Sequence, residues 1–278
     1  MMPKLVKLLT QISQQLDTGL STSQQQLTQQ QNPEALHDLR VSLRQLRSLL
    51  RPLRADLDEA RDLDGLVKKM MGSTNRIRDR EVLIVELKQQ QLFVLADDYQ
   101  RGLQDAYLHV AEQFELTVIQ QRLLSLVQYW QHALSAHTVR QLEKHIRQQW
   151  RQQSQKLFKR LQHKQPQKTK DRHRLRILIK QLRYSCETYQ KILPKRANAQ
   201  TLPLKKLQEL LGRWHDYSVF LADAEQQTEL HVLIPIWQQQ LNYWEHKSDQ
   251  ALKRLKRDKK IPHDRLFLLE EKRRASSR

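Results

Sequence analysis

The scarcity of helix-breaking residues is the feature that most constrains the fold of this chain. Only five Gly and eight Pro occur in 278 residues, and between them apolar side chains recur with the period of an α-helix. A many-stranded sheet needs more turn chemistry than this, whereas long helices need only occasional caps and breaks. The sequence therefore predicts an all-α protein.

Ten helices follow from the apolar periodicity and the positions of the breaks. The strongest start signal is Asn32 followed by Pro33, because Asn caps free amides and Pro suits the first helical turn. Further breaks are expected at 72–75, Ser135, Pro194, Pro203 and Gly212. The expected helices span about 4–30, 33–57, 58–71, 78–92, 96–132, 136–162, 170–193, 203–211, 217–228 and 231–257.

The charge balance points to a polyanionic partner. Lys and Arg number 49 against 30 Asp and Glu, which leaves a net charge of +19, while 38% hydrophobic residues suffice for a core. A folded protein with this excess is suited to nucleic acid, polymeric phosphate or an anionic membrane surface. Composition does not choose among these three.

Several other classes are disfavoured by what the sequence lacks. The single cysteine, Cys186, excludes an intramolecular disulfide and a Cys-based zinc site. The N-terminal segment has no cleavable apolar core, and no run of about 18 apolar residues occurs. We therefore expect a soluble cytoplasmic protein with no membrane association, no metal and no cofactor.

One helix carries its basic residues in a single stripe. At about 100° per residue, the stripe falls beside the leucine face of the helix rather than opposite to it. No Asp or Glu lies three or four residues from its central arginines, so either a ligand or acids from other helices must satisfy them. The stripe consists of His37, Arg40, Arg44, Arg47, Arg51 and Arg54.

The same pattern recurs 136 residues later, where His173, Arg176, Lys180 and Arg183 overlay the first four members of the stripe. A second pair of motifs, Arg78-Asp79 and His215-Asp216, is related by an offset of 137 residues. Two related halves favour pseudo-twofold packing, in which the two stripes face a shared central cleft. The histidines are expected to contact phosphate or orient the first arginine, and the aspartates to cap helices or hold arginines.

A third stripe and a terminal basic run are weaker candidates. The third stripe has the same spacing but includes Glu143 nearby, and the run from Lys253 to Lys260 is either a solvated end or an auxiliary anion patch. The third stripe consists of His137, Arg140, Lys144, Arg147 and Arg151.

Together these motifs resemble the CHAD family, α-helical domains marked by histidines. The resemblance covers residues 1–262, with halves of about 1–135 and 136–262, and leaves 263–278 as a basic tail. It implies two four-helix-type bundles related by a pseudo-twofold axis around a basic central cleft that binds inorganic polyphosphate without catalysis. Two departures are Gln45, where the family often has a basic residue, and Arg78, where a His is expected.

The resemblance and the stripes define the expected polyphosphate-binding residues. They are His37, Arg40, Arg44, Arg47, Arg51, His173, Arg176, Lys180, Arg183, Arg140, Lys144 and Arg147. A polyphosphate-metabolising enzyme is a further expected partner, and polyphosphate granules are a further expected location.

Nucleic-acid binding through the same helices is the alternative function. Weak, non-specific binding follows from charge alone, but the dispersed tryptophans do not alternate with the basic stripes as a base-stacking platform requires. An enzyme is not expected, because neither H-E-x-x-H nor G-x-x-x-x-G-K occurs.

Overall fold

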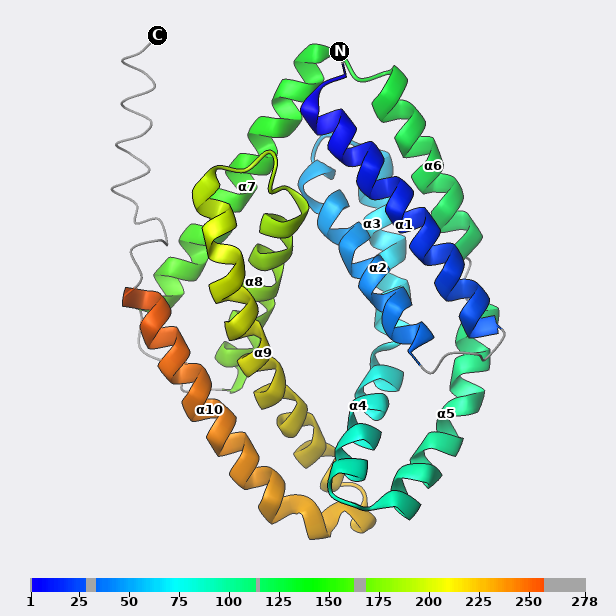
Figure 1. Cartoon of the computed structure of the whole chain (residues 1–278), viewed down its shortest axis with the longest axis vertical. Coiled ribbons are helices and arrows are strands. Elements are labelled where there is room, and N and C mark those ends of the chain that lie inside the picture. The colour runs from blue at the N-terminus through cyan, green and yellow to red at the C-terminus, as the bar shows by residue number, and fades with distance from the viewer. Residues whose placement is uncertain (1, 29–33, 114–115, 163–168, 258–278) are drawn as a thin grey trace. The chain divides into compact units, whose positions relative to one another are not determined.

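The computed structural model describes residues 2–28, 34–113, 116–162 and 169–257. Within these ranges the regular elements are all helices, which confirms the all-α prediction (Figure 1). The elements are α1 (Lys4–Thr28), α2 (Ala35–Leu50), the 3-10 helix η1 (Arg51–Leu53), α3 (Asp58–Ser73), α4 (Asn75–Gln89), α5 (Phe93–Gln113), α6 (Leu116–His132), α7 (Ala136–Gln162), α8 (Thr169–Thr188), α9 (Lys195–Ala224), the 3-10 helix η2 (Thr228–Leu233) and α10 (Ile234–Arg257).

The chain divides into two compact units, Met1–His145 and Ile146–Arg278, and the division falls inside α7. The halves inferred from the sequence divide just before α7 instead. The tail at 263–278 lies outside the described residues. The finer arrangement, two four-helix bundles about a pseudo-twofold axis and a shared cleft, stays a prediction.

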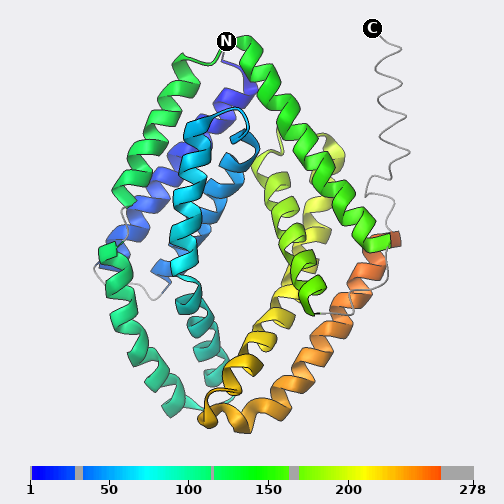
Figure 2. The ribbon, with the colours of Figure 1, turned by 180° about the vertical axis from the view of Figure 1, so that it is seen from behind.

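Unit 1 is built around α1 and α2. Helix α1 packs against α2 and runs antiparallel to α6, which it also contacts (Figures 1 and 2). Helix α3 packs against α2 and α6. Helices α4 and α5 form a hairpin. A side chain at Gly19 of α1 would meet the Ser42 Oγ of α2 at 3.0 Å, so glycine permits this close approach. Leucines dominate the α2 core face, namely Leu36, Leu39, Leu43, Leu46, Leu49 and Leu50.

Unit 2 is built around α9, which packs against α8 on one side and α10 on the other. The C-terminal part of α7 adds Ile146 and Trp150 to the core. Trp150 contacts the buried thiol of Cys186, whose pKa is raised to about 12, chiefly by burial. This cysteine is therefore a core residue with no reactive thiolate at neutral pH.

Two expected helix breaks are wrong, because α9 runs unbroken through Pro203 and Gly212. Proline removes one backbone hydrogen bond, and glycine costs about 1 kcal/mol of helix propensity. Burial of a long apolar stripe against α8 and α10 outweighs both penalties, since tertiary packing overrides propensity. The buried stripe is Leu204, Leu207, Leu211, Trp214 and Tyr217.

The second expected helix also ends earlier than predicted. It stops at Leu50 rather than near residue 57, and Arg51–Leu53 forms a 3-10 turn. Pro52 explains this end, because it has no N–H to continue the helical hydrogen bonds. The start signal at Asn32 and Pro33 lies outside the described residues, as do residues 114–115 within the expected helix 96–132.

Candidate functional site

Arg40, the first arginine of the unit 1 stripe, also anchors the turn between α3 and α4. It is 9% exposed. Its Nη1 donates to the Met71 carbonyl oxygen at 3.0 Å and to Thr74 Oγ1, and its Nη2 donates to Asn75 Oδ1 at 2.9 Å. Arg40 therefore has a structural role in this turn as well as a place in the stripe.

Arg47, further along α2, is paired with an acid from another helix. Its Nε lies 2.9 Å from Asp64 Oδ1, and Arg54 Nη1 lies 2.8 Å from Asp64 Oδ2. Asp64 is buried on the apolar face of α3. Of the two alternatives that the sequence left open for Arg47, the structure shows the one in which another helix supplies the acid.

Arg51 is crowded by these arginines. Burial lowers its pKa first, and the neighbouring Arg47 and Arg54 lower it further, while Asp64 acts in the opposite direction. One carboxylate thus lies among three guanidinium groups. The cluster keeps a positive excess at the end of α2.

Arg40 also lies in a second cationic cluster, formed with Arg44 on α2 and Arg78 on α4. Burial is the main reason that the pKa of Arg40 is lowered, followed by Arg44, with Arg78 acting in the same direction and Asp79 opposing it. Arg78 Nη1 bonds Glu81 Oε2 at 2.8 Å. The two sequence motifs of unit 1 therefore meet in space.

His37 begins the unit 1 stripe and is partly buried. Its Nδ1 is enclosed and has no hydrogen-bond partner among the described residues.

The two motifs of unit 2 meet in the same way, through a pair of histidines. The rings of His173 on α8 and His215 on α9 have centroids 5.3 Å apart and are tilted by 53°. Burial lowers the pKa of His215 to about 3, with further lowering by Arg176, His173 and Lys180. Burial and Arg176 also lower the pKa of His173.

This cluster brings three expected binding residues together with His215, which the expected set omitted. The internal repeat could have identified His215, because His215 corresponds to Arg78 with an offset of 137 residues. Equivalent clusters therefore form in the two units, Arg40 and Arg44 with Arg78 in one, and Arg176 and Lys180 with His215 in the other.

Arg183 ends the unit 2 stripe and is held by its neighbours. Its Nε donates to Gln208 Oε1 at 2.8 Å, and its Nη1 lies 2.7 Å from Glu187 Oε1. Its guanidinium also lies 4.3 Å from the centroid of the Tyr184 ring. Like Arg47, Arg183 is therefore a stripe arginine that forms an ion pair with an acidic residue of the same unit.

Two members of the third stripe are more exposed than the central residues of the stripes on α2 and α8. Arg140 and Lys144 are exposed, and Arg147 Nε donates to the Ile192 carbonyl oxygen at 3.1 Å. With an offset of 141 residues, Leu5, Leu9 and Ser13 of α1 match Ile146, Trp150 and Ser154 of α7, and all six are buried. Helix α7 is thus the counterpart of α1, which carries no basic stripe.

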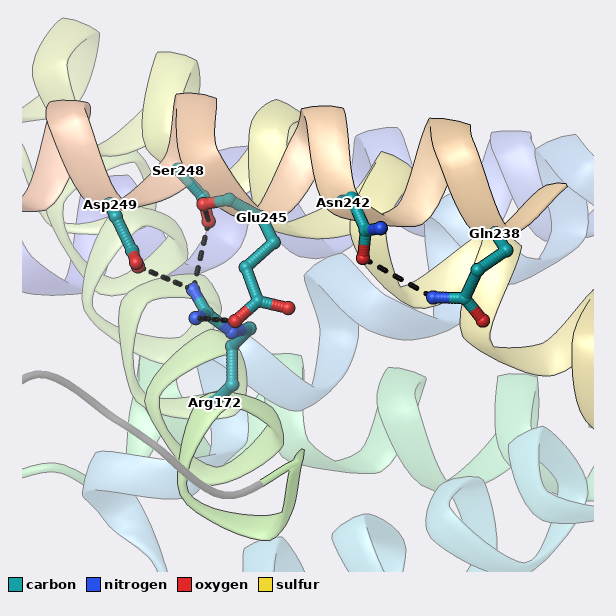
Figure 3. A network of polar contacts seen from close by, with 6 residues as sticks. All are labelled: Arg172, Gln238, Asn242, Glu245, Ser248 and Asp249. Carbon is teal, nitrogen blue, oxygen red and sulfur yellow. Dashed lines mark hydrogen bonds and ion pairs between the residues drawn. The ribbon is translucent and has the colours of Figure 1, made fainter. Parts of the chain in front are cut away.

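Arg172 is a charged core residue that the sequence reasoning missed (Figure 3). Its side chain is 3% exposed, and it bonds three side chains of α10. These contacts are Ser248 Oγ at 3.0 Å, Asp249 Oδ1 at 2.6 Å and Glu245 Oε1 at 2.8 Å. The internal repeat could have predicted that Arg172 is buried. With the 136-residue offset, Arg172 corresponds to Leu36, which is fully buried.

Asp79 and Asp216 do not cap helices. Helix α4 begins at Asn75 after Thr74, so Asp79 already lies within its second turn, and Asp216 lies in the interior of α9. Burial lowers the pKa of Arg40 overall, and the negative charge of Asp79 opposes this lowering. Charge balance for this arginine, rather than capping, is therefore the role of Asp79.

Neither a membrane-spanning helix nor a cluster of metal ligands occurs among the described residues. No described helix is long and apolar enough to cross a membrane. No group of three or more potential metal ligands occurs among the residues that the structure describes.

The fold and these clusters define an all-α protein in which a basic pair of helices occurs twice. The family model of the CHAD domain matches residues 10–225, and the chain belongs to the CHAD-domain family, as the motifs predicted. The match ends before η2 and α10.

A solved structure with this fold is the crystal structure of the CHAD domain from the plant Ricinus communis. It is similar with a TM-score of 0.64 and 22% sequence identity, and the match covers 90% of this chain and 91% of that chain. At this identity the likeness shows the fold alone. A search of curated proteins gave no match.

Proposed function

We propose that this protein binds inorganic polyphosphate through the basic stripes of α2 and α8 and does not act on it chemically. The observation that carries the proposal is the convergence of Arg176, Lys180 and His173 on His215, whose ring centroid lies 5.3 Å from that of His173. Burial is the main reason that the pKa of His215 is lowered, and all three neighbours lower it further. Like charges crowded into one place favour an anionic ligand, because the anion removes their mutual repulsion.

The spacing of the stripes supports a linear polyanion rather than a single phosphate. Residues three or four apart on a helix advance about 5 Å along its axis, so consecutive cations follow consecutive charges of a polymer. Arginine adds forked, two-point contacts and lysine a point charge. Membership in the CHAD family is consistent with this ligand.

The placement of four of the five tryptophans supports polyphosphate over nucleic acid. Trp130, Trp150, Trp214 and Trp237 are at most 3% exposed. Proteins that bind single strands stack bases on accessible aromatic rings, and buried rings do not serve this purpose. We therefore expect affinity for DNA or RNA to arise from charge alone.

A competition experiment tests the proposal. Labelled long-chain polyphosphate is displaced by single- and double-stranded DNA of matched total charge, at moderate and at raised salt. We expect polyphosphate to bind more tightly per charge at both salt concentrations. Equal affinity per charge would contradict the proposal and favour a general polyanion or nucleic-acid binder.

A matched pair of variants tests the site itself. Neutralising Arg176 and Lys180 together should reduce the salt slope by about two units, one for each lost phosphate contact. In the control variant, Lys205 and Arg213 are neutralised instead. Both are exposed on α9, and their neutralisation changes the net charge by the same amount. Equal losses in the two double variants would assign binding to diffuse charge rather than to the stripe.

A further inference from the structure

The paired imidazoles of unit 2 place a titratable group where the proposed ligand binds. His173 and His215 come from different helices, and their ring centroids are 5.3 Å apart. His173 is the first residue of the α8 stripe, and Arg176 and Lys180 follow on the same face. Unit 1 lacks such a pair, because Arg78 occupies the position equivalent to His215.

We propose that the His173–His215 pair takes up a proton when polyphosphate binds, so that binding strengthens as the pH falls. The inference rests on the proposed function and adds its regulation by pH. Without the polymer, the positive charge of Arg176 disfavours a proton on either ring, and that of Lys180 disfavours a proton on His215. With the polymer bound, phosphate oxygens supply the opposite charge and accept a hydrogen bond from the protonated ring.

The electrostatics of the free protein agree with this starting state. The pKa of His215 is about 3, and the pKa of His173 lies below its usual 6.5, with burial as the main cause for both. Both rings are therefore largely neutral near pH 7. Each ring has a neighbouring ring that disfavours a second proton, so the pair titrates as a unit that gains one charge.

The other charged groups around α9 leave this cluster cationic. On α10, Glu245 and Asp249 are engaged by Arg172. On η2, Glu229 and His231 are exposed.

On α9 itself, Asp216 follows His215, and Arg213 is exposed. The charged groups that shift the pKa of His215 are the three of α8, His173, Arg176 and Lys180, and all three lower it.

Linkage gives the sign and the size of the effect. Because the bound state holds more protons than the free state, affinity increases as the pH falls. The increase is at most about tenfold per pH unit for one proton, and it occurs between the pKa of the free pair and that of the bound pair.

The test measures proton uptake directly on the intact protein. Titration calorimetry with long-chain polyphosphate at pH 6.5, in two buffers of different ionisation enthalpy, gives the number of protons taken up. We expect between about half a proton and one proton per protein. A long polymer keeps the contribution of its titrating end groups small.

Two variants assign the proton to the pair. His173→Gln combined with His215→Gln should remove most of the uptake and flatten the pH dependence of the dissociation constant. His246→Gln is the control, because His246 is exposed on α10 and bonds only Gln250 among the described residues. It should behave like the unmodified protein.

The outcomes separate the two proposals. Tight binding without proton uptake by the unmodified protein would overturn this inference and leave the proposed function intact, whatever the variants do. Uptake that persists in a folded double variant would also overturn it. Absence of polyphosphate binding at every pH would overturn both.

Discussion

Replacing Arg172 tests whether its buried network holds α10 onto α8. Arg172→Ala removes three hydrogen bonds, two of them to carboxylates, and each charge-assisted bond contributes about 1.5–3 kcal/mol. Glu245 and Asp249 are 44% and 22% exposed, so water recovers part of this loss. Relief of the buried guanidinium's desolvation offsets more, and we expect a net loss of about 2–3 kcal/mol in the free energy of unfolding.

Arg172→Leu sharpens the prediction, because the equivalent residue of unit 1 is the fully buried Leu36. A leucine restores buried apolar contact, and the freed carboxylates turn to solvent. The loss should therefore be about 1 kcal/mol. This ordering of Ala and Leu follows from the internal repeat.

The control for both variants is Arg174→Ala. Arg174 is 64% exposed and lies 3.7 Å from an exposed carboxylate of Asp171, so its removal should cost less than about 0.5 kcal/mol. Urea unfolding measures all three variants, and hydrogen exchange of α10 amides locates the effect. Equal losses for Arg172→Ala and Arg174→Ala would refute the structural role of the network, and equal losses for the two Arg172 variants would refute the equivalence with Leu36.

Four further predictions concern unit 1 and the ligand. Asp64→Asn should destabilise the protein by about 2 kcal/mol, because it removes the buried charge shared by Arg47 and Arg54, whereas the exposed Asp62→Asn should have little effect in urea unfolding. Arg44→Glu should weaken polyphosphate binding far more than the exposed Arg122→Glu in a direct titration; equal losses would argue for diffuse charge. Purified protein should release no orthophosphate from polyphosphate, with or without magnesium, and turnover above a blank would contradict a binding-only function. Tripolyphosphate should bind much more weakly than a chain of many tens of units if one polymer engages both stripes; equal affinities would contradict the shared cleft expected from the sequence.

The candidate site was predictable where it depends on local spacing. The stripes on α2 and α8 follow from residues three and four apart, and this spacing specifies a helix face before any tertiary contact forms. The repeat offset likewise identifies which residues of the two units correspond. His215 and Arg172 could both have been found in this way, because they lie 137 residues after Arg78 and 136 residues after Leu36.

The roles of the stripe arginines were not predictable from the same pattern. Arg47 looked free of acids because none lies within one helical turn, yet Asp64, 17 residues away on α3, pairs with it. The sequence contains one indication of this pairing, because Asp64 lies on the apolar face of its helix. Whether an arginine meets an acid, a backbone carbonyl or a ligand depends on which helices pack beside it.

The helical class, most helix positions, the internal repeat and the family could all be predicted from the sequence, because periodicity and spacing are local properties that do not depend on packing. Tertiary structure alone decided that α9 continues through Pro203 and Gly212, that Arg172 is buried against α10, and that His173 meets His215. Burial of a continuous apolar face outweighs weak helix breakers. The contacts of Arg172 join residues 73 to 77 positions apart, and no pattern within one helix encodes a contact between helices.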